Sequence, residues 1–360
     1  MSKKKKHLSH SLKILWLLLI LCLLGLFFVF EASIVESYAN FGYQYHYFFR
    51  QLQWFGIGIA IFVLGSLFPI KYLERLSPYI FLSSVILLLV VFIPSIGLEI
   101  NGAKRWFSIF GFSIQPVEFF KVSLVVYFAN WLSKHQRVLP LLFSTSFPVI
   151  ILLLQPDFGS LLIILFMATG MFFIAGGSIK KLLPIVVVVV VFLTIAVFTS
   201  PYRLKRVKSF IDPNSDPLGA SFQIRQITLA LGSGGVFGRG LGNSQHKYAF
   251  IPEASSDSIF AIVAEEVGFV GSMVLLFLFS YYVFLLYRLS IVLKTNSFEQ
   301  LLVTGLWLWV SGQTLLNLAA IVALVPLTGL TLPFFSQGGS SLVSLLFLNG
   351  IVYKLARTQN

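Results

Sequence analysis

The sequence predicts an all-α, polytopic integral membrane protein. Hydrophobic residues make up 57% of the 360-residue chain, charged residues only 11%, and the mean hydropathy is +0.90. A soluble domain carries about 25% charged residues, so this composition is typical of a chain that lies largely in lipid. The net charge of +13 does not predict nucleic-acid binding, because in a membrane protein the location of the charges matters more than their sum.

Apolar segments predict the membrane spans. A helix needs about 20 apolar residues to cross the hydrocarbon core. We interpret the first apolar segment as a retained span, because it is longer than a signal peptide requires and no clear cleavage site follows it. On this measure we expect about ten transmembrane helices, near residues 14–34, 51–70, 78–96, 116–133, 140–156, 158–177, 182–199, 257–288, 299–325 and 338–356.

The basic residues predict the orientation. Each segment on the predicted inner side carries a pair or more of Lys and Arg, as the positive-inside rule expects. We therefore expect both termini in the cytoplasm, with residues 1–13 as a basic tail, 14–356 as a single membrane domain and 357–360 as a second tail. The inner basic residues are Lys3, Lys4, Lys5, Lys6, Lys13, Lys71, Arg75, Lys134, Arg137, Lys180, Lys181, Arg288, Lys294, Lys354 and Arg357.

A large extracellular loop, about residues 200–256, is predicted between the seventh and eighth spans. Long loops cross the membrane despite their basic residues. Those residues either attract anionic lipid, at about 1 kcal/mol each, or form an electropositive floor for an anionic, lipid-linked substrate, and charge alone leaves both interpretations open. Apolar residues from Phe222 to Leu231 predict an amphipathic segment on the membrane surface. The glycine run 232–242 does not follow a strand, which excludes a dinucleotide-binding or phosphate-binding loop.

The most informative stretch is 245–272, where a polar loop becomes an apolar helix. Asp257 lies at this transition, and four of the 13 acidic residues of the chain are Glu253, Asp257, Glu265 and Glu266. Carboxylates at membrane depth are costly unless they pair or have a function. Helix capping near Asp257 is the simplest alternative, but it leaves the two later glutamates unexplained.

Other ionisable residues are predicted near the same outer surface. Glu118 and Lys121, at i, i+3 spacing, form either a structural ion pair or part of a site. Asp157 either caps the helix that begins at Phe158 or belongs to that site. Because Arg105 and Asp257 are expected at this surface too, a common site explains the cluster better than unrelated pairs do.

Uncharged polar residues mark two further segments. Gln313 and Asn317 share a helix face at i, i+4 spacing, which favours interhelical hydrogen bonding over catalysis. Residues 326–341 predict a re-entrant or broken helix start, which is tolerated where it lines a cavity. The N–H groups around Ser340 and Ser341 would there present a helix N-terminus to an anion.

Five motifs together resemble the SEDS family (shape, elongation, division and sporulation) of FtsW, RodA and SpoVE, in family order over nearly the whole chain. The motifs are NGAKRWF at 101–107, QPVEFFK at 115–121, QPDFGS at 155–160, GLGNS with PEASSD between 240 and 257, and PLTGLTLPFFSQGGSSL at 326–342. The resemblance implies a peptidoglycan glycosyltransferase that polymerises lipid II at the outer face of the bacterial cytoplasmic membrane, in division or elongation. It also implies lipid II and undecaprenyl-pyrophosphate-linked glycan as ligands. The implied protein partners are a class B penicillin-binding protein and other divisome or elongasome membrane proteins.

The resemblance assigns roles to particular residues. The essential family aspartate corresponds to Asp257, which we expect to act as general base in an inverting transfer. Further candidates are substrate-binding residues at the same surface. These are Arg105, Lys121, Glu118, Lys104, Lys247, Glu253 and Ser340. The chain departs from the family motifs at Ser255-Ser256, where the family has His-Thr, and at Gln337, where it has Tyr.

No pattern in the sequence matches a metal-site signature, because the histidines are scattered. A divalent cation near Asp257, Mg²⁺ or Mn²⁺, is the only cofactor expected. Two other functions remain open. A lipid II flippase would also use broken helices and buried charge, and a non-catalytic scaffold for a penicillin-binding protein would not need Asp257.

Overall fold

The computed structural model describes residues 2–100, 103–135, 137–198, 201–212, 220–247, 251 and 253–358. Pro252, residues 359–360 of the predicted tail and parts of the predicted outer loop lie outside this set.

All ten predicted apolar segments are helices. They are α1 (Ser2–Phe41), α2 (His46–Leu67), α3 (Ile70–Val90), α4 (Pro116–Leu132), α5 (Val138–Leu154), α6 (Phe158–Ile174), α7 (Ile179–Phe198), α10 (Ile259–Val292), α11 (Phe298–Ile321) and α12 (Gly339–Thr358). Within the described residues, six are long and apolar enough to cross a membrane, namely α1, α2, α3, α10, α11 and α12, and α5 and α6 contain shorter apolar segments. The chain is therefore a multi-pass membrane protein, and the number of crossings stays a prediction.

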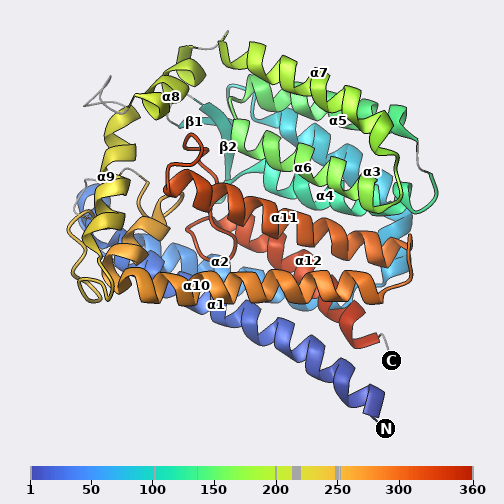
Figure 1. Ribbon diagram of the computed structural model, residues 1–360, viewed down its shortest axis with the longest axis horizontal. Coiled ribbons are helices and arrows are strands. Elements are labelled where there is room, and N and C mark those ends of the chain that lie inside the picture. The colour runs from blue at the N-terminus through green and yellow to red at the C-terminus, as the bar shows by residue number, and fades with distance from the viewer. Residues whose placement is uncertain are drawn as a thin grey trace.

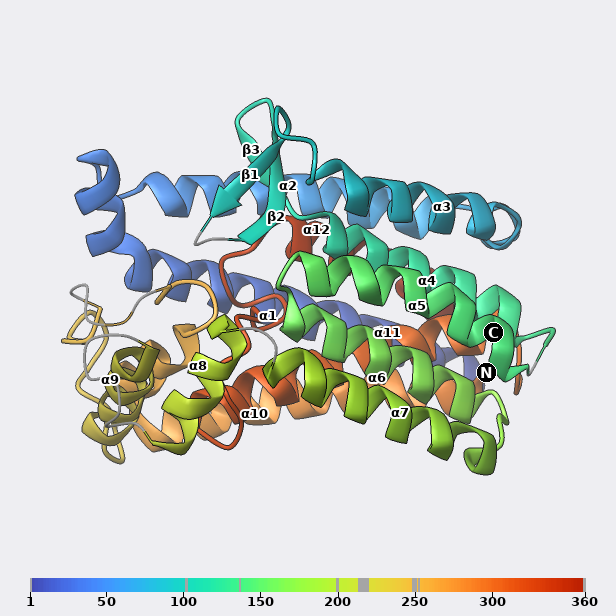
Figure 2. The same ribbon diagram turned by 90° about the horizontal axis from the view of Figure 1, so that it is seen from above.

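The helices lie side by side along the long axis of the molecule, and both termini lie at the same end (Figure 1). The helices α8 (Pro201–Ile211) and α9 (Ala220–Ser233) lie toward the opposite end, away from the termini (Figure 2). The two described helices of the predicted outer loop thus lie at the end away from the termini. Which side of a membrane each end faces stays a prediction.

The centre of the bundle is built from α4, α11 and α12. Leu124, Phe128 and Trp309 are fully buried there, whereas apolar side chains of α7 and α10 stay exposed and suit contact with lipid rather than water. α2 packs closely on α12 because glycine removes the side chain at the contact: a Cβ on Gly350 would lie 2.1 Å from the carbonyl oxygen of Phe62.

A small sheet corrects the all-α prediction. The segment between the third and fourth predicted spans forms the antiparallel strands β1 (Gly97–Ile100), β2 (Ala103–Ile109) and β3 (Phe112–Ile114) in the order β1-β2-β3. Phe110 and Gly111 both have positive φ, 50° and 77°, as a two-residue hairpin turn requires. The alternation of buried and exposed residues in these strands is too short to predict a sheet from sequence.

Two expected segments take a different form. Helix α1 is continuous from Ser2 through the predicted basic tail, and Ser11 is already buried. The cytoplasmic location of residues 1–13 stays a prediction. The amphipathic segment predicted on the membrane surface is α9, and it packs against α10. Ile227 of α9 is only 1% exposed and joins the hydrophobic core, so this apolar face covers protein rather than lipid.

Helix α10 is broken at Gly268, which has φ 67° and ψ −167°. The glycine-rich segment 234–240 runs along the break and satisfies its main chain. Arg239 N donates to the carbonyl of Glu265 at 3.0 Å, and Phe269 N donates to the carbonyl of Gly235 at 2.9 Å. Gly268 is required here because its φ is positive and because a Cβ would lie 2.2 Å from Gly238 N.

Candidate functional site

An open cavity of about 480 Å³ lies where the sheet, α8 and the loops before α10 and α12 meet. Of the predicted site residues, the structure brings four to its lining: Arg105, Glu253, Asp257 and Ser340. Polar and aromatic side chains from α1 and α2 complete the opposite wall. The cavity is therefore lined by segments from both halves of the chain.

Asp257 lies two residues before α10, and its main chain is held by α11. Asn317 Nδ2 donates to the carbonyl oxygen of Asp257 at 2.9 Å, and Ser258 Oγ donates to Asp257 Oδ1 at 3.3 Å. Burial, and to a smaller extent the nearby Glu253 carboxylate, raise the pKa of the Asp257 carboxyl, and with the lowering effect of Arg206 included this pKa is about 7. A carboxyl with this pKa is suited to exchange protons near neutral pH.

Arginines form a cationic wall. Arg105 Nε donates to the carbonyl of Gln155 at 3.0 Å, and its Nη2 donates to the carbonyl of Pro156. Arg206 of α8 donates to the carbonyl of Leu327 at 2.7 Å and also lines the cavity. These bonds to main-chain carbonyls fix the positions of the two guanidinium groups.

Glu253 and Ser340 also line the cavity. Glu253 is exposed, has φ 52°, and accepts a hydrogen bond from Ser256 Oγ at 3.1 Å. Ser340, in the first turn of α12, accepts a hydrogen bond at Oγ from Gln115 N at 3.0 Å. The predicted helix N-terminus thus lines the cavity, although the Ser340 hydroxyl is already used to position Gln115.

Glu118 and Lys121 do not line the cavity. They form a buried ion pair in α4 with Nζ and Oε1 2.8 Å apart, and the side chain of Lys121 is fully buried. Lys121 Nζ donates to Gln313 Oε1 at 3.0 Å and lies 4.8 Å from the ring centroid of Trp309. The pair is therefore buried outside the cavity lining, and its contact with a substrate stays a prediction. Interhelical bonding by Gln313 is confirmed.

Lys104 and Lys247 also lie outside the cavity lining. Lys104 is exposed on β2 and lies 3.9 Å from Glu99. Lys247 is 6% exposed and its Nζ lies 3.1 Å from Glu266 Oε1 and 3.4 Å from Glu31 Oε2. Lys247 therefore forms a buried ion pair, and its contact with a substrate stays a prediction.

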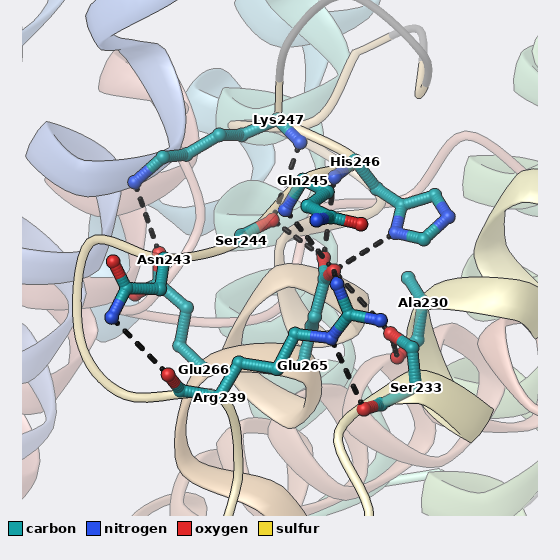
Figure 3. A network of polar contacts seen from close by, with 10 residues as sticks. All are labelled: Ala230, Ser233, Arg239, Asn243, Ser244, Gln245, His246, Lys247, Glu265 and Glu266. Atoms are coloured by element: carbon teal, nitrogen blue, oxygen red, sulfur yellow. Dashed lines mark hydrogen bonds and ion pairs between the residues drawn. The ribbon is translucent and has the colours of Figure 1, made fainter.

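The two glutamates that capping could not explain hold the loop before the site (Figure 3). Glu265 is fully buried and accepts hydrogen bonds from Ser244 Oγ at 2.5 Å, from Gln245 N at 3.1 Å and from His246 Nδ1 at 3.0 Å. Glu266 pairs with Lys247. Their cost at membrane depth is thus offset by partners from residues 244–247. For Asp157, the capping alternative is confirmed, because its Oδ1 accepts a hydrogen bond from Ser160 N at 3.1 Å at the start of α6.

The sequence did not identify the α1–α2 wall of the cavity. Glu36, Tyr47, Arg50 and Trp54 line it, and Arg50 stacks over the ring of Phe112 at 4.9 Å. The available signal for this wall was the charge of Arg50, which directly precedes a predicted span. It carried little weight because basic residues commonly flank spans.

The described residues do not form an evident metal centre. Among them, no group of three or more His, Cys, Asp and Glu side chains is placed to hold an ion. Three carboxyl groups, those of Glu36, Glu253 and Asp257, line the cavity. A divalent cation beside Asp257 stays a prediction.

These features define a class: a multi-pass membrane protein with a carboxylic acid of raised pKa and fixed arginines in an open cavity at one end. Within that class, the chain belongs to the FtsW/RodA/SpoVE family, described as cell cycle protein, whose sequence profile matches residues 12–360. The predicted family is thereby confirmed.

Individual relatives agree with this assignment. The chain is 37% identical over 344 residues, 93% of its length and 86% of the relative's, to the probable peptidoglycan glycosyltransferase FtsW of Thioalkalivibrio sp. (strain K90mix). It is 32% identical to stage V sporulation protein E of Bacillus subtilis (strain 168), with 98% of each chain covered.

Solved structures share the fold. A chain from a study of polymerization and crosslinking by a peptidoglycan synthase complex superposes with a TM-score of 0.78 at 29% identity, covering 96% of this chain and 97% of that one. The rod shape determining protein RodA of Thermus thermophilus superposes with a TM-score of 0.70 at 27% identity, covering 96% of each chain.

Proposed function

We propose that this chain is a peptidoglycan glycosyltransferase that polymerises lipid II in the cavity around Asp257. The observation that carries the proposal is the placement of a carboxyl with a pKa of about 7 in one cavity with Arg105 and Arg206. The names of the relatives, peptidoglycan glycosyltransferase among them, support the same activity.

In the proposed reaction, Asp257 takes the proton of the 4-hydroxyl of the acceptor GlcNAc. The hydroxyl oxygen forms a bond to the anomeric carbon of the donor chain on the face opposite the leaving group. The bond from that carbon to the pyrophosphate oxygen breaks, and undecaprenyl pyrophosphate leaves with the electron pair. The configuration changes from α to β, and the proton stays on Asp257 until solvent removes it.

Arg105 and Arg206 act on the leaving group in this proposal. Negative charge grows on the pyrophosphate as the bond breaks, and cations that are already fixed in place stabilise that charge most strongly. Both guanidinium groups are held by main-chain carbonyls, so little reorganisation is needed during the reaction.

The surroundings of the site follow from the same proposal. We infer that the cavity faces the outer side of the bacterial cytoplasmic membrane, with both termini in the cytoplasm. Residues 1–13 and 357–360 would then lie on the cytoplasmic side of one membrane domain. A crosslinking partner, the class B penicillin-binding protein expected from the sequence, is supported by the likeness to a chain from a synthase complex that polymerises and crosslinks.

The test is polymerisation of lipid II by the purified protein, with and without a candidate transpeptidase, beside Asp257→Asn. Glycan ladders from the parent and none from the variant are expected. Equal ladders from both would exclude Asp257 as the base. Lipid II translocation into liposomes without any polymer would indicate a flippase instead.

A further inference from the structure

Three buried side chains of α4 and α11 meet at one amide oxygen. Lys121 Nζ lies 3.0 Å from Gln313 Oε1, and Trp309 Nε1 lies 2.7 Å from the same atom. An ammonium and an indole N–H can only donate hydrogen bonds. Gln313 must therefore direct its oxygen toward them, and its NH₂ group must point the other way.

The NH₂ group of Gln313 reaches the wall of the cavity. Its Nε2 donates to the carbonyl oxygen of Thr331 at 2.8 Å and lies 3.4 Å from Thr331 Oγ1. Thr331 lines the cavity with Asp257. The buried ion pair of Glu118 and Lys121 is thus linked to the cavity through one amide.

Asn317, one turn further along α11, makes a matching connection. Its Nδ2 donates to the carbonyl oxygens of Asp257 at 2.9 Å and of Leu330 at 2.6 Å. It therefore ties the loop that carries Asp257 to the loop that carries Thr331. Gly329 lies at the same contact, since a Cβ on it would be 3.9 Å from Asp257 Oδ2.

We infer that Gln313 and Asn317 are positioning residues that hold Thr331 and Asp257 in the geometry of the reaction, and that Lys121 acts through the amide of Gln313. This inference rests on the proposed function. It assigns Glu118 and Lys121 an indirect role, since both side chains are buried away from the cavity lining. Misplacement of a reacting group by about 1 Å is sufficient for a loss of about 10²-fold.

The first experiment compares kcat and KM for lipid II among variants of α11. Gln313→Met, which removes both ends of the link, should lower kcat about tenfold or more with KM little changed. Gln313→Glu keeps an acceptor for Lys121 and Trp309 but loses the donor to Thr331, so it should be equally slow. Gln300→Met is the matched control, because Gln300 is a buried amide of the same helix that bonds Asn296 N at 2.6 Å. Gln300→Met should retain the parental kcat even if its unfolding temperature falls as much as that of Gln313→Met.

The second experiment tests whether Lys121 acts through Gln313. The double variant Glu118→Gln/Lys121→Met removes the ion pair without leaving one buried charge alone. Introduced into the parental protein, the double variant should lower kcat. Introduced into Gln313→Met, it should lower kcat by less than about a further twofold, because the effects of coupled residues are not additive. Multiplicative losses would show that Lys121 acts independently, and a parental kcat in Gln313→Glu would overturn the inference. Failure of the proposed function is distinguishable, because the parent itself would then make no polymer.

Discussion

Asn317 binds the main chain of Asp257 rather than its carboxylate. The amide nitrogen of Asn317 donates to the Asp257 carbonyl at 2.9 Å, so the carboxyl group stays available to the cavity while its backbone is fixed. This separation of support from chemistry is what a general base needs: a fixed position and a carboxylate not consumed by a strong ion pair.

Replacement of Asp257 by Asn should remove most polymerisation. General-base assistance is typically worth about 10²–10⁴-fold, and the isosteric amide cannot accept the proton. Because Asn keeps the shape and the backbone contacts, the unfolding temperature should change little. Initial rates with lipid II and a thermal unfolding curve measure the two effects separately, and parallel losses of both would point to misfolding instead.

The rate should depend on pH with an acidic limb near pH 7. The general base must be ionised, and burial raises the pKa of Asp257 to about 7, so activity should rise as the pH passes upward through that value. Stability should change in the opposite direction. The folded state binds this proton more tightly than the unfolded chain, so the contribution to stability is complete below the ordinary pKa and is lost as pH rises through 7.

Glu253→Gln should move that limb to lower pH. The Glu253 carboxylate raises the pKa of Asp257, and removal of its negative charge favours ionisation of Asp257. Arg206→Gln should move the limb to higher pH for the opposite reason. Profiles of kcat against pH for the parent and the two variants check both signs, and an unshifted limb in both would mean that Asp257 is not the titrating group.

Arg105→Gln and Arg206→Gln should each slow polymerisation by about 10²-fold, as loss of a fixed donor to developing charge commonly does. Lys104→Gln is the matched control. It removes a neighbouring cation that is exposed on β2 and does not line the cavity. Lys104 Nζ lies 3.9 Å from Glu99 Oε2. Measured rates with lipid II should leave the Lys104 variant near the parent, and equal losses in all three would favour a general effect of positive charge.

Lys247→Met should destabilise the fold by about 3–5 kcal/mol, because it leaves the buried carboxylate of Glu266 without its cation. The combined Lys247→Met/Glu266→Gln variant should recover much of that stability. Unfolding in detergent measures the difference. Folded Lys247→Met protein should keep its KM for lipid II, and a large rise in KM would return Lys247 to the substrate site.

Local signals identified much of this protein in advance. Apolar length located the ten helices, because a span must satisfy its backbone hydrogen bonds internally whatever its neighbours are. The sheet at 97–114 was missed, because alternation over so few residues is not distinguishable from a polar loop. The five motifs together indicated the family, and the family profile confirmed it.

Charge partners could not be predicted in the same way. Arg206 and Lys247 belong to one predicted basic loop, yet the first lines the cavity and the second is buried beside Glu266. Arg50, far away in the sequence, lies on the cavity wall. Only the packing of distant helices decides such neighbours.

The sequence by itself thus determined that the chain is helical, membrane-embedded and carries an aspartate at the end of a span, because composition and periodicity report local burial. The tertiary structure alone decided that Glu118 and Lys121 are buried outside the cavity lining and that Arg50 and Asp257 share one cavity. The physical reason is that a buried charge takes its role from the groups brought within a few ångströms of it, and those groups come from helices that the chain order does not place together.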